Sequence, residues 1–122
     1  QAIALYGSFE TPITLRKLNT KLTQLLARRP QIIGDLSKPV RHIAWCSGAA
    51  QHAFEAAVGL GVDVYLTGEI SEQNVHVARE TGVAFISAGH HATERYGIQA
   101  LGEYIAQRFG LVHHFVDVEN PV

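Results

Sequence analysis

The feature that most constrains the fold is an alternation of short apolar segments with helix-forming segments after residue 40. The first three apolar segments end in glycine, serine or threonine, and the stretches after them have the length and composition of helices. These patterns predict strands over residues 41–46, 62–66, 83–88 and 111–118, and helices over residues 49–58, 71–80 and 93–109. Strands that alternate with helices of about ten residues indicate crossover connections. The sequence therefore predicts an α/β fold, a layered sandwich with a mixed, mainly parallel sheet flanked by helices.

The first forty residues are less regular. Residues 3–6 are apolar and predict a short strand. Thr11 followed by Pro12 is typical of a helix start, because a hydroxyl caps the first turn and proline suits the first helical position. Leucines at helical spacing then predict a helix that ends at Pro30. Residues 31–39 are expected to form a loop with a brief extended piece.

The length and composition of the chain limit the classes of protein to which it can belong. The chain has 122 residues, which suits one domain, and 47% of them are hydrophobic, which is enough for a core. Ten basic and eleven acidic residues give a net charge of −1, so there is no clear signal for binding nucleic acid or an anionic membrane. No apolar run approaches the roughly 20 residues that span a bilayer.

Two further features concern the setting of the chain. Cys46 is the single cysteine, which excludes an internal disulfide and predicts a reducing, cytoplasmic location. The sequence begins at Gln1 and contains no methionine. We therefore expect the chain to be one α/β domain over residues 1–122 of a longer protein, in which a shared site is only partly present.

The loop over residues 89–94 carries the clearest chemistry. Ligands of open α/β sheets bind beyond the carboxyl ends of the strands, and this loop follows a predicted strand. His90 and Glu94 are four residues apart, so their side chains can share one face of a helix. An imidazole and a carboxylate that converge suit zinc, iron or manganese. In the alternative reading, the histidine bonds the backbone and Glu94 complements the helix dipole. Two ligands are too few for a tight site, so others are expected elsewhere.

The two other strand-end loops carry weaker signals. Glu69 follows a glycine at a strand end, and His76 follows it in the next helix, so both are candidates for a general base or for holding a metal-bound water. Ser71 and Glu72 are better explained as a helix cap and a dipole partner. The loop after Cys46 contains small residues that suit an anion, but it matches neither a Walker A motif nor GxGxxG.

A series of short motifs supports a more specific hypothesis. In order they are Trp45-Cys46-Ser47-Gly48 with Gln51, Gly61-Val62-Asp63, Thr67-Gly68-Glu69 with Ser71-Glu72-Gln73, His76, Gly89-His90-His91-Ala92-Thr93-Glu94-Arg95 and Asn120-Pro121. With these motifs, residues 43–121 resemble the C-terminal half of the GTP cyclohydrolase I type 2 homologues, a family of dinuclear metal proteins. The first forty residues fit the region that precedes it less closely.

The resemblance implies a site shared between two similar α/β halves. His90 and Glu94 match the metal ligands of the C-terminal half, and nothing in this chain matches the His-His pair and aspartate of the other half. It further implies two divalent metal ions (zinc, iron or manganese) in the full-length protein, which would assemble as a ring-shaped hexamer. Glu69 and His76 would then transfer protons or support the ligands.

Three functions are considered for this sequence. The first is a metal-dependent hydrolase that acts on a small, nucleotide-like substrate. The second is a metal-binding adaptor or metal-handling protein without turnover, and the third is a nucleotide-binding module without metal. The sequence favours the first slightly over the second, and both over the third.

Overall fold

The two central strands of the sheet send alternate side chains into two apolar layers. In the computed structural model, which describes residues 4–122, β4 (Val64–Thr67) and β5 (Ala84–Ser87) are parallel, with Tyr65 opposite Phe85. Val64 and Ile86 belong to one buried layer, and Tyr65 and Phe85 belong to the other. Because successive side chains of a strand point to opposite faces, these apolar runs are buried on both sides.

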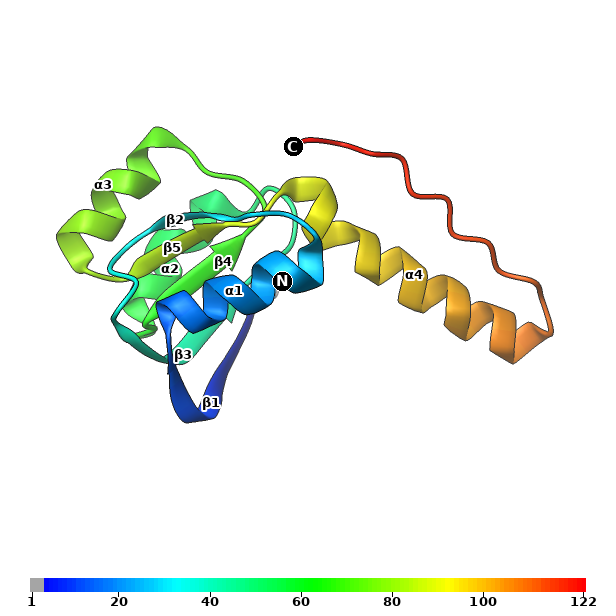
Figure 1. Ribbon diagram of the computed structural model, residues 1–122, viewed down its shortest axis with the longest axis horizontal. Helices are drawn as coiled ribbons and strands as arrows, with labels where there is room; N and C mark the ends of the chain where they lie inside the picture. The colour runs from blue at the N-terminus through cyan, green and yellow to red at the C-terminus, as the bar shows by residue number, and fades with distance from the viewer. Residues whose placement is uncertain (1–3) are drawn as a thin grey trace.

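The sheet has five strands in the order β1-β3-β4-β5-β2. β3 (Pro39–Trp45) is parallel to β4, while β1 (Leu5–Thr14) pairs antiparallel with β3 and β2 (Gln31–Ile33) pairs antiparallel with β5. The parallel strands thus form the centre and the antiparallel strands form the edges (Figure 1). The predicted mixed, mainly parallel α/β sandwich is confirmed, as are the three central strands.

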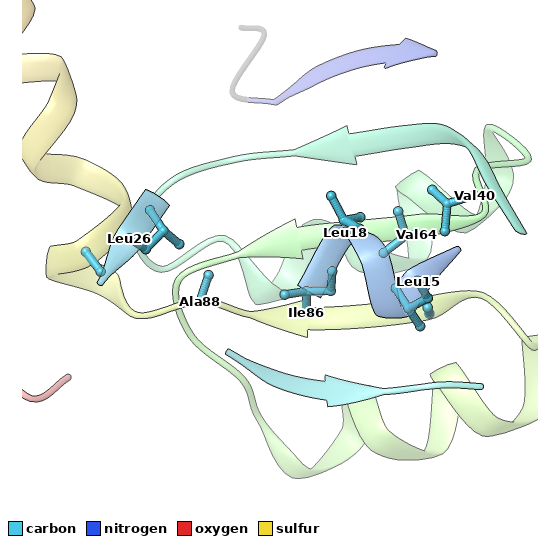
Figure 2. Packing of buried hydrophobic residues seen from close by; sticks show 9 residues of the cluster. Leu15, Leu18, Leu26, Val40, Val64, Ile86 and Ala88 are labelled. Carbon is cyan, nitrogen blue, oxygen red and sulfur yellow. The ribbon is translucent and has the colours of Figure 1, made fainter. Parts of the chain in front are cut away.

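One face of the sheet is covered by α1 (Leu15–Leu26). Leu15, Leu18 and Leu26 are buried at helical spacing. Leu15 and Leu18 lie near Val64 and Ile86, and Leu26 lies near Ala88 (Figure 2). This leucine stripe is the apolar face that the sequence pattern predicted. The burial of large aliphatic side chains here stabilises the fold by roughly 1.5–3 kcal/mol for each side chain.

The other face is covered by α2 (Phe54–Gly59), preceded by a short 3-10 helix over Gln51–Ala53, and by α3 (Glu72–Thr81). Phe54 packs edge-on against Phe85, with ring centroids 4.9 Å apart and an interplanar angle of 74°. Tyr65 stacks on Phe54 at 5.8 Å. These three buried rings, together with Ala57 of α2 and Ala78 of α3, form the second core.

The N-terminal prediction needs two corrections. Pro12 does not start a helix, because β1 continues to Thr14 with an irregular register between Ser8 and Ile13. Proline lacks a backbone N–H, and an edge strand with broken register tolerates this loss. The helix begins at Leu15, and its cap is Thr14, whose Oγ1 accepts a hydrogen bond from Lys17 N at 3.2 Å. Of the strand predicted over residues 3–6, residue 3 lies outside the described residues, and the strand observed there, β1, begins at Leu5 and continues to Thr14.

The last helix and the segment after it extend beyond the sandwich. α4 (His90–Phe109) begins three residues earlier than predicted and runs away from the sheet, and residues 110–122 return alongside it (Figure 1). The strand predicted over residues 111–118 is wrong for this structure, because the segment lies along α4, where no strand of residues 4–122 is available to pair with it. No helix in the described part of the chain is long and apolar enough to cross a membrane.

Candidate functional site

The side chain of His90 lies between two carboxylates where β5 leads into α4. Its Nδ1 is 2.6 Å from Glu69 Oε1, and its Nε2 is 3.0 Å from Glu94 Oε2. His90 and Glu94 are one turn apart on α4, whereas Glu69 comes from the loop after β4. The side chains of His90 and Glu94 are 37% and 53% exposed, so the open side of this cluster is accessible to solvent and to ions.

The carboxylates control the charge of His90. The hydrogen bond to Glu69 is the main cause that raises the pKa of His90, burial opposes it, and the negative charge of Glu94 adds to the increase. A carboxylate only accepts hydrogen bonds, so the protonated imidazole can direct one ring proton toward each carboxylate. A metal ion at Nε2 would replace one of these protons and leave the bond to Glu69 in place.

Backbone hydrogen bonds tie the three strand-end loops together beneath His90. Gly68 N donates to Gly48 O at 2.9 Å, and Gly89 N donates to Gly68 O at 2.9 Å. Gly48 N donates to Thr93 Oγ1 at 3.0 Å, which connects the first loop to the first turn of α4. The positions of Glu69, His90 and Glu94 are therefore set by a connected set of backbone bonds.

Two glycines in these loops make the close approach possible. A Cβ at Gly68 would lie 2.7 Å from His90 Cα and 2.6 Å from Gly48 O. Gly48 has a φ of +68°, and a Cβ there would overlap the carboxylate of Glu94 and lie 3.1 Å from His90 Nε2. Any side chain at position 48 would fill the space in front of His90 and Glu94, so glycine keeps this space open.

Buried polar side chains support the loops from below. Thr67 is fully buried, and its Oγ1 accepts from Ala50 N at 3.2 Å and donates to Gly48 O at 3.1 Å. The hydroxyl of Tyr65 donates to Ala50 O at 2.8 Å, and burial raises its pKa to about 12. A hydroxyl and a phenol thereby satisfy backbone groups that are removed from water.

Asn74 links α3 to the same loops. Its Nδ2 donates to Gln51 O at 2.9 Å, and its Oδ1 accepts from Ser71 N at 2.8 Å, which completes a capping box with Ser71. Gln51 Nε2 in turn approaches Glu69 Oε2 at 3.4 Å. Our sequence reading did not assign Asn74 or Thr67 to the site. The available signals were the Ser-x-x-Asn spacing at the helix start and a threonine directly after an apolar strand.

Comparison with known proteins places this geometry in a family. Residues 1–121 match the family model of DUF34/NIF3, described as NGG1p interacting factor 3. The chain belongs to the DUF34/NIF3 family. This result confirms the resemblance that the motifs indicated, since relatives in this family are named GTP cyclohydrolase 1 type 2 homolog.

Individual relatives show how much of such a protein the chain represents. It is 50% identical to the Pseudomonas aeruginosa GTP cyclohydrolase 1 type 2 homolog over 121 residues, covering 99% of this chain and 48% of the relative. It is 54% identical to the homolog from Neisseria meningitidis serogroup B over 116 residues, covering 94% of this chain and 46% of the relative. The chain therefore spans about half the length of the curated relatives that it matches.

Solved structures give the same proportion. A structure of protein ybgI, described as of unknown function, has a TM-score of 0.92 and 38% identity and covers 100% of this chain and 50% of that one. The protein TTHA1606 from Thermus thermophilus has a TM-score of 0.80 and 28% identity, over 95% of this chain and 47% of that one. The NIF3-family fold of this chain, including α4 and the segment after it, is thus like that of chains about twice its length.

The donor set of this NIF3-family chain fits part of a metal site. Two ligand atoms that share a metal at about 2.1 Å lie roughly 3.0–3.4 Å apart, depending on the coordination geometry, and His90 Nε2 and Glu94 Oε2 are 3.0 Å apart. Among residues 4–122, no group of three or more histidine, cysteine, aspartate or glutamate side chains is placed to hold an ion. The chain thus presents two converging donors and lacks a complete ligand set within its described part.

The other predicted site residues lie elsewhere. His76 is exposed on α3, and within residues 4–122 no hydrogen bond or ion pair joins it to His90, Glu69 or Glu94. Its suggested part in proton transfer stays a prediction. Cys46 is half-buried at the end of β3, with its Sγ 3.5 Å from Ser47 O.

Proposed function

We propose that this chain supplies one half of a dinuclear metal centre in a metal-dependent hydrolase that acts on a nucleotide-like substrate. The observation that carries the proposal is the arrangement around His90. One ring nitrogen is held by Glu69 at 2.6 Å, and the other converges with Glu94 at 3.0 Å on the solvent-accessible side. Nitrogen and carboxylate donors in this combination suit zinc, iron or manganese.

Glu69 would hydrogen-bond the metal ligand His90 and would not contact the metal ion itself. Its bond to Nδ1 fixes the orientation and the tautomer of His90, so that Nε2 presents a lone pair once its proton is lost. The same bond makes the imidazole a stronger base. The loss of an outer carboxylate of this kind typically lowers metal affinity 10- to 100-fold.

A hollow beside the two donors has the size for a small substrate. It has a volume of about 350 Å³ and is lined by His90, His91, Glu94, Asn120 and Val122. Ligand pockets start at about 300 Å³, so this hollow suits a small molecule or one portion of a nucleotide. Two bound ions would activate a water and polarise the bond under attack. The remaining ligands would come from the part of the full-length protein that this chain does not match.

A second candidate, a metal-handling protein without turnover, draws support from the openness of the site. Glu94 is 53% exposed, and an ion held by two donors at the surface exchanges readily with solvent. Turnover separates the two candidates. The intact Pseudomonas aeruginosa relative, loaded with zinc or manganese, should release product from a panel of nucleotides if the first candidate is right. A metal-loaded relative with no turnover on any of them would favour the second.

The ligand assignment can be tested on this chain directly. We expect zinc titration followed by NMR to shift the ring signals of His90 and leave those of His76 in place, so that His76 is an internal control. Glu94→Gln should weaken the zinc response of His90 at least about tenfold, because it removes one of two ligands. Glu72→Gln, which changes an exposed carboxylate on α3, should not. An unchanged zinc response in Glu94→Gln would overturn the proposal.

A further inference from the structure

Arg28 lies in the turn that follows α1, beside the start of α4. α1 ends at Leu26, and Ala27 after it adopts the left-handed conformation with a φ of 52°. Arg95 Nη2 donates to Leu26 O at 2.8 Å, which ties the end of α1 to α4 (Figure 1). Arg28 is half-buried at this junction. The turn therefore places a cationic side chain next to the loop that leads into His90.

The guanidinium of Arg28 packs against the backbone of Gly89, the residue before His90. A Cβ at Gly89 would lie 2.7 Å from Arg28 Nε and 3.0 Å from Arg28 Cζ, and φ at Gly89 is +96°. Glycine thus leaves room for the guanidinium at this position. As a result, the positive charge of Arg28 lies close to the first turn of α4, which carries the candidate metal ligands.

The charge of Arg28 is not paired with a carboxylate. Its Nη1 donates to the backbone oxygen of Pro121, and within residues 4–122 it forms no ion pair. Arg95, by contrast, pairs with Asp117 at 3.1 Å. A guanidinium is always charged, and its five N–H donors form a fork that matches the oxygens of a phosphate. One bond to a backbone oxygen leaves most of these donors available to an anion.

A hollow of about 350 Å³ is lined by Arg28 and by the loop after β4. Gln31 and Ser87 contribute further polar side chains to its lining. Val122 lines this hollow and also the hollow beside the two candidate metal donors, so the two meet at Val122. One molecule can therefore contact Arg28 at one end and approach the metal donors with the other.

Neighbouring carboxylates decide which side of Arg28 suits an anion. A second hollow at Arg28 is lined by Asp117 and Glu119, whose charges would repel a phosphate. Among the described residues that line the first hollow, Glu69 alone is acidic. Its Oε1 is already held by His90 Nδ1 at 2.6 Å. The first hollow is therefore the side on which Arg28 can bind an anion.

We propose that Arg28 and this first hollow bind a phosphate group of the substrate, which makes the site specific for phosphorylated molecules over uncharged nucleosides. The assignment of the anion to a substrate rests on the proposed function, because it uses the meeting of this hollow with the one beside His90 and Glu94. Binding of the anion itself requires no metal, since the guanidinium supplies charge-assisted, bidentate hydrogen bonds.

Phosphate titration of this chain tests the site. In metal-free buffer, inorganic phosphate should shift the Arg28 Nε–H and Gly89 amide NMR signals with a Kd of roughly 1–10 mM, as expected for a few charge-assisted bonds. Arg28→Gln should weaken the response of Gly89 at least about tenfold, because it removes the cation. Arg29→Gln, which makes the same charge change at the adjacent exposed arginine, should leave the Kd within about twofold. No saturable shift, or equal losses in the two variants, would overturn the proposal.

A matched pair of ligands tests the specificity. AMP should bind the parent chain at least about tenfold more tightly than adenosine, which lacks the phosphate, and Arg28→Gln should abolish this preference. Equal binding of AMP and adenosine to the parent would contradict the assignment.

The zinc response of His90 separates this proposal from the proposed function. Phosphate binding at Arg28 without a zinc response at His90 would refute the metal site and support the anion site. A zinc response at His90 without phosphate binding would refute the anion site alone.

Discussion

The first turn of α4 is held by hydrogen bonds to other parts of this chain, whereas the rest of the helix leaves large apolar side chains exposed. In the first turn, Thr93 Oγ1 accepts from Gly48 N and donates to Gly89 O, and His90 is held by Glu69. Beyond it, apolar side chains such as Tyr104 and Phe109 are 64% and 68% exposed. The first turn of the helix is therefore held by the loops at the strand ends, and the other end lacks a covering partner within the described residues.

The difference teaches which parts of the molecule are self-sufficient. The sandwich buries aromatic and aliphatic side chains on both faces of its sheet, so its stability comes from within residues 4–88. The arm, which is α4 together with residues 110–122, buries little apolar surface and is fixed to the sandwich mainly by polar contacts. Substitutions of the same type should therefore have large effects in the sandwich and small effects in the arm.

The largest expected difference is between two phenylalanines. Phe54→Ala removes a ring that is 1% exposed and packed between Tyr65 and Phe85, and it should lower the free energy of unfolding by about 3–5 kcal/mol. Phe109→Ala, in the arm, should change it by no more than about 0.5 kcal/mol. Urea denaturation followed by circular dichroism measures both. Equal losses would show that the arm is packed in solution, against our comparison.

Alanine substitutions at two glycines should give a similar contrast, with changes in stability of intermediate size. Gly48→Ala should destabilise the protein by about 1–2 kcal/mol, because φ is +68° there and the new methyl group would overlap Glu94. It should also weaken the zinc response of His90. Gly97→Ala in α4 meets nothing within 4 Å and should stabilise the helix by up to about 1 kcal/mol. A stable Gly48→Ala protein with an unchanged zinc response would contradict the claim that position 48 has no room for a side chain beside Glu94.

The carboxylate of Asp63 provides a pH-dependent test of the sandwich. Burial acts to raise its pKa, but hydrogen bonds from the backbone N–H groups of His42 and Arg41, both at 2.8 Å, outweigh this and lower it. A lowered pKa in the folded state gives stability that is present above the ordinary aspartate pKa of about 4 and is lost as the pH falls through the folded value.

Asp63→Asn should therefore cost about 1 kcal/mol at neutral pH, and the difference from the parent should shrink as the pH falls below about 4. Urea denaturation across pH 2.5–7 (roughly the span over which aspartates titrate) measures the difference. A cost that does not vary with pH would show that Asp63 contributes packing and not charge.

The smallest effect is expected at the ion pair that fixes the arm. Asp117→Asn weakens the contacts with His91 and Arg95 but leaves the sandwich intact, so the free energy of unfolding should fall by less than about 1 kcal/mol. The local effect should be larger. Limited proteolysis after residue 110 should become faster than in the parent, and unchanged cleavage would mean that other contacts hold the segment.

The order of elements could be predicted from the sequence because each strand and helix of the sandwich carries its own local pattern. The four-residue step from His90 to Glu94 also predicted their proximity, since spacing on one helix fixes it. The contact between Glu69 and His90 joins residues 21 apart and depends on the order of β4 and β5 in the sheet, so spacing alone did not show it.

The errors have a physical cause as well. Thr11 and Pro12 carry the signature of a helix start, but pairing of β1 with β3 through Thr14 outweighs local propensity. Residues 111–118 carry the pattern of a strand, yet a strand requires a partner as well as a pattern. In both cases the local signal is real, and the availability of a neighbouring strand decides the structure.

The most direct test of the central claim, that this chain holds half of a metal site, is metal content by mass spectrometry after loading with zinc or manganese and desalting. We expect this chain to retain almost no metal, because two exposed ligands release an ion readily, and the intact Pseudomonas aeruginosa relative to retain about two ions per chain. About two ions retained by this chain alone would contradict the account.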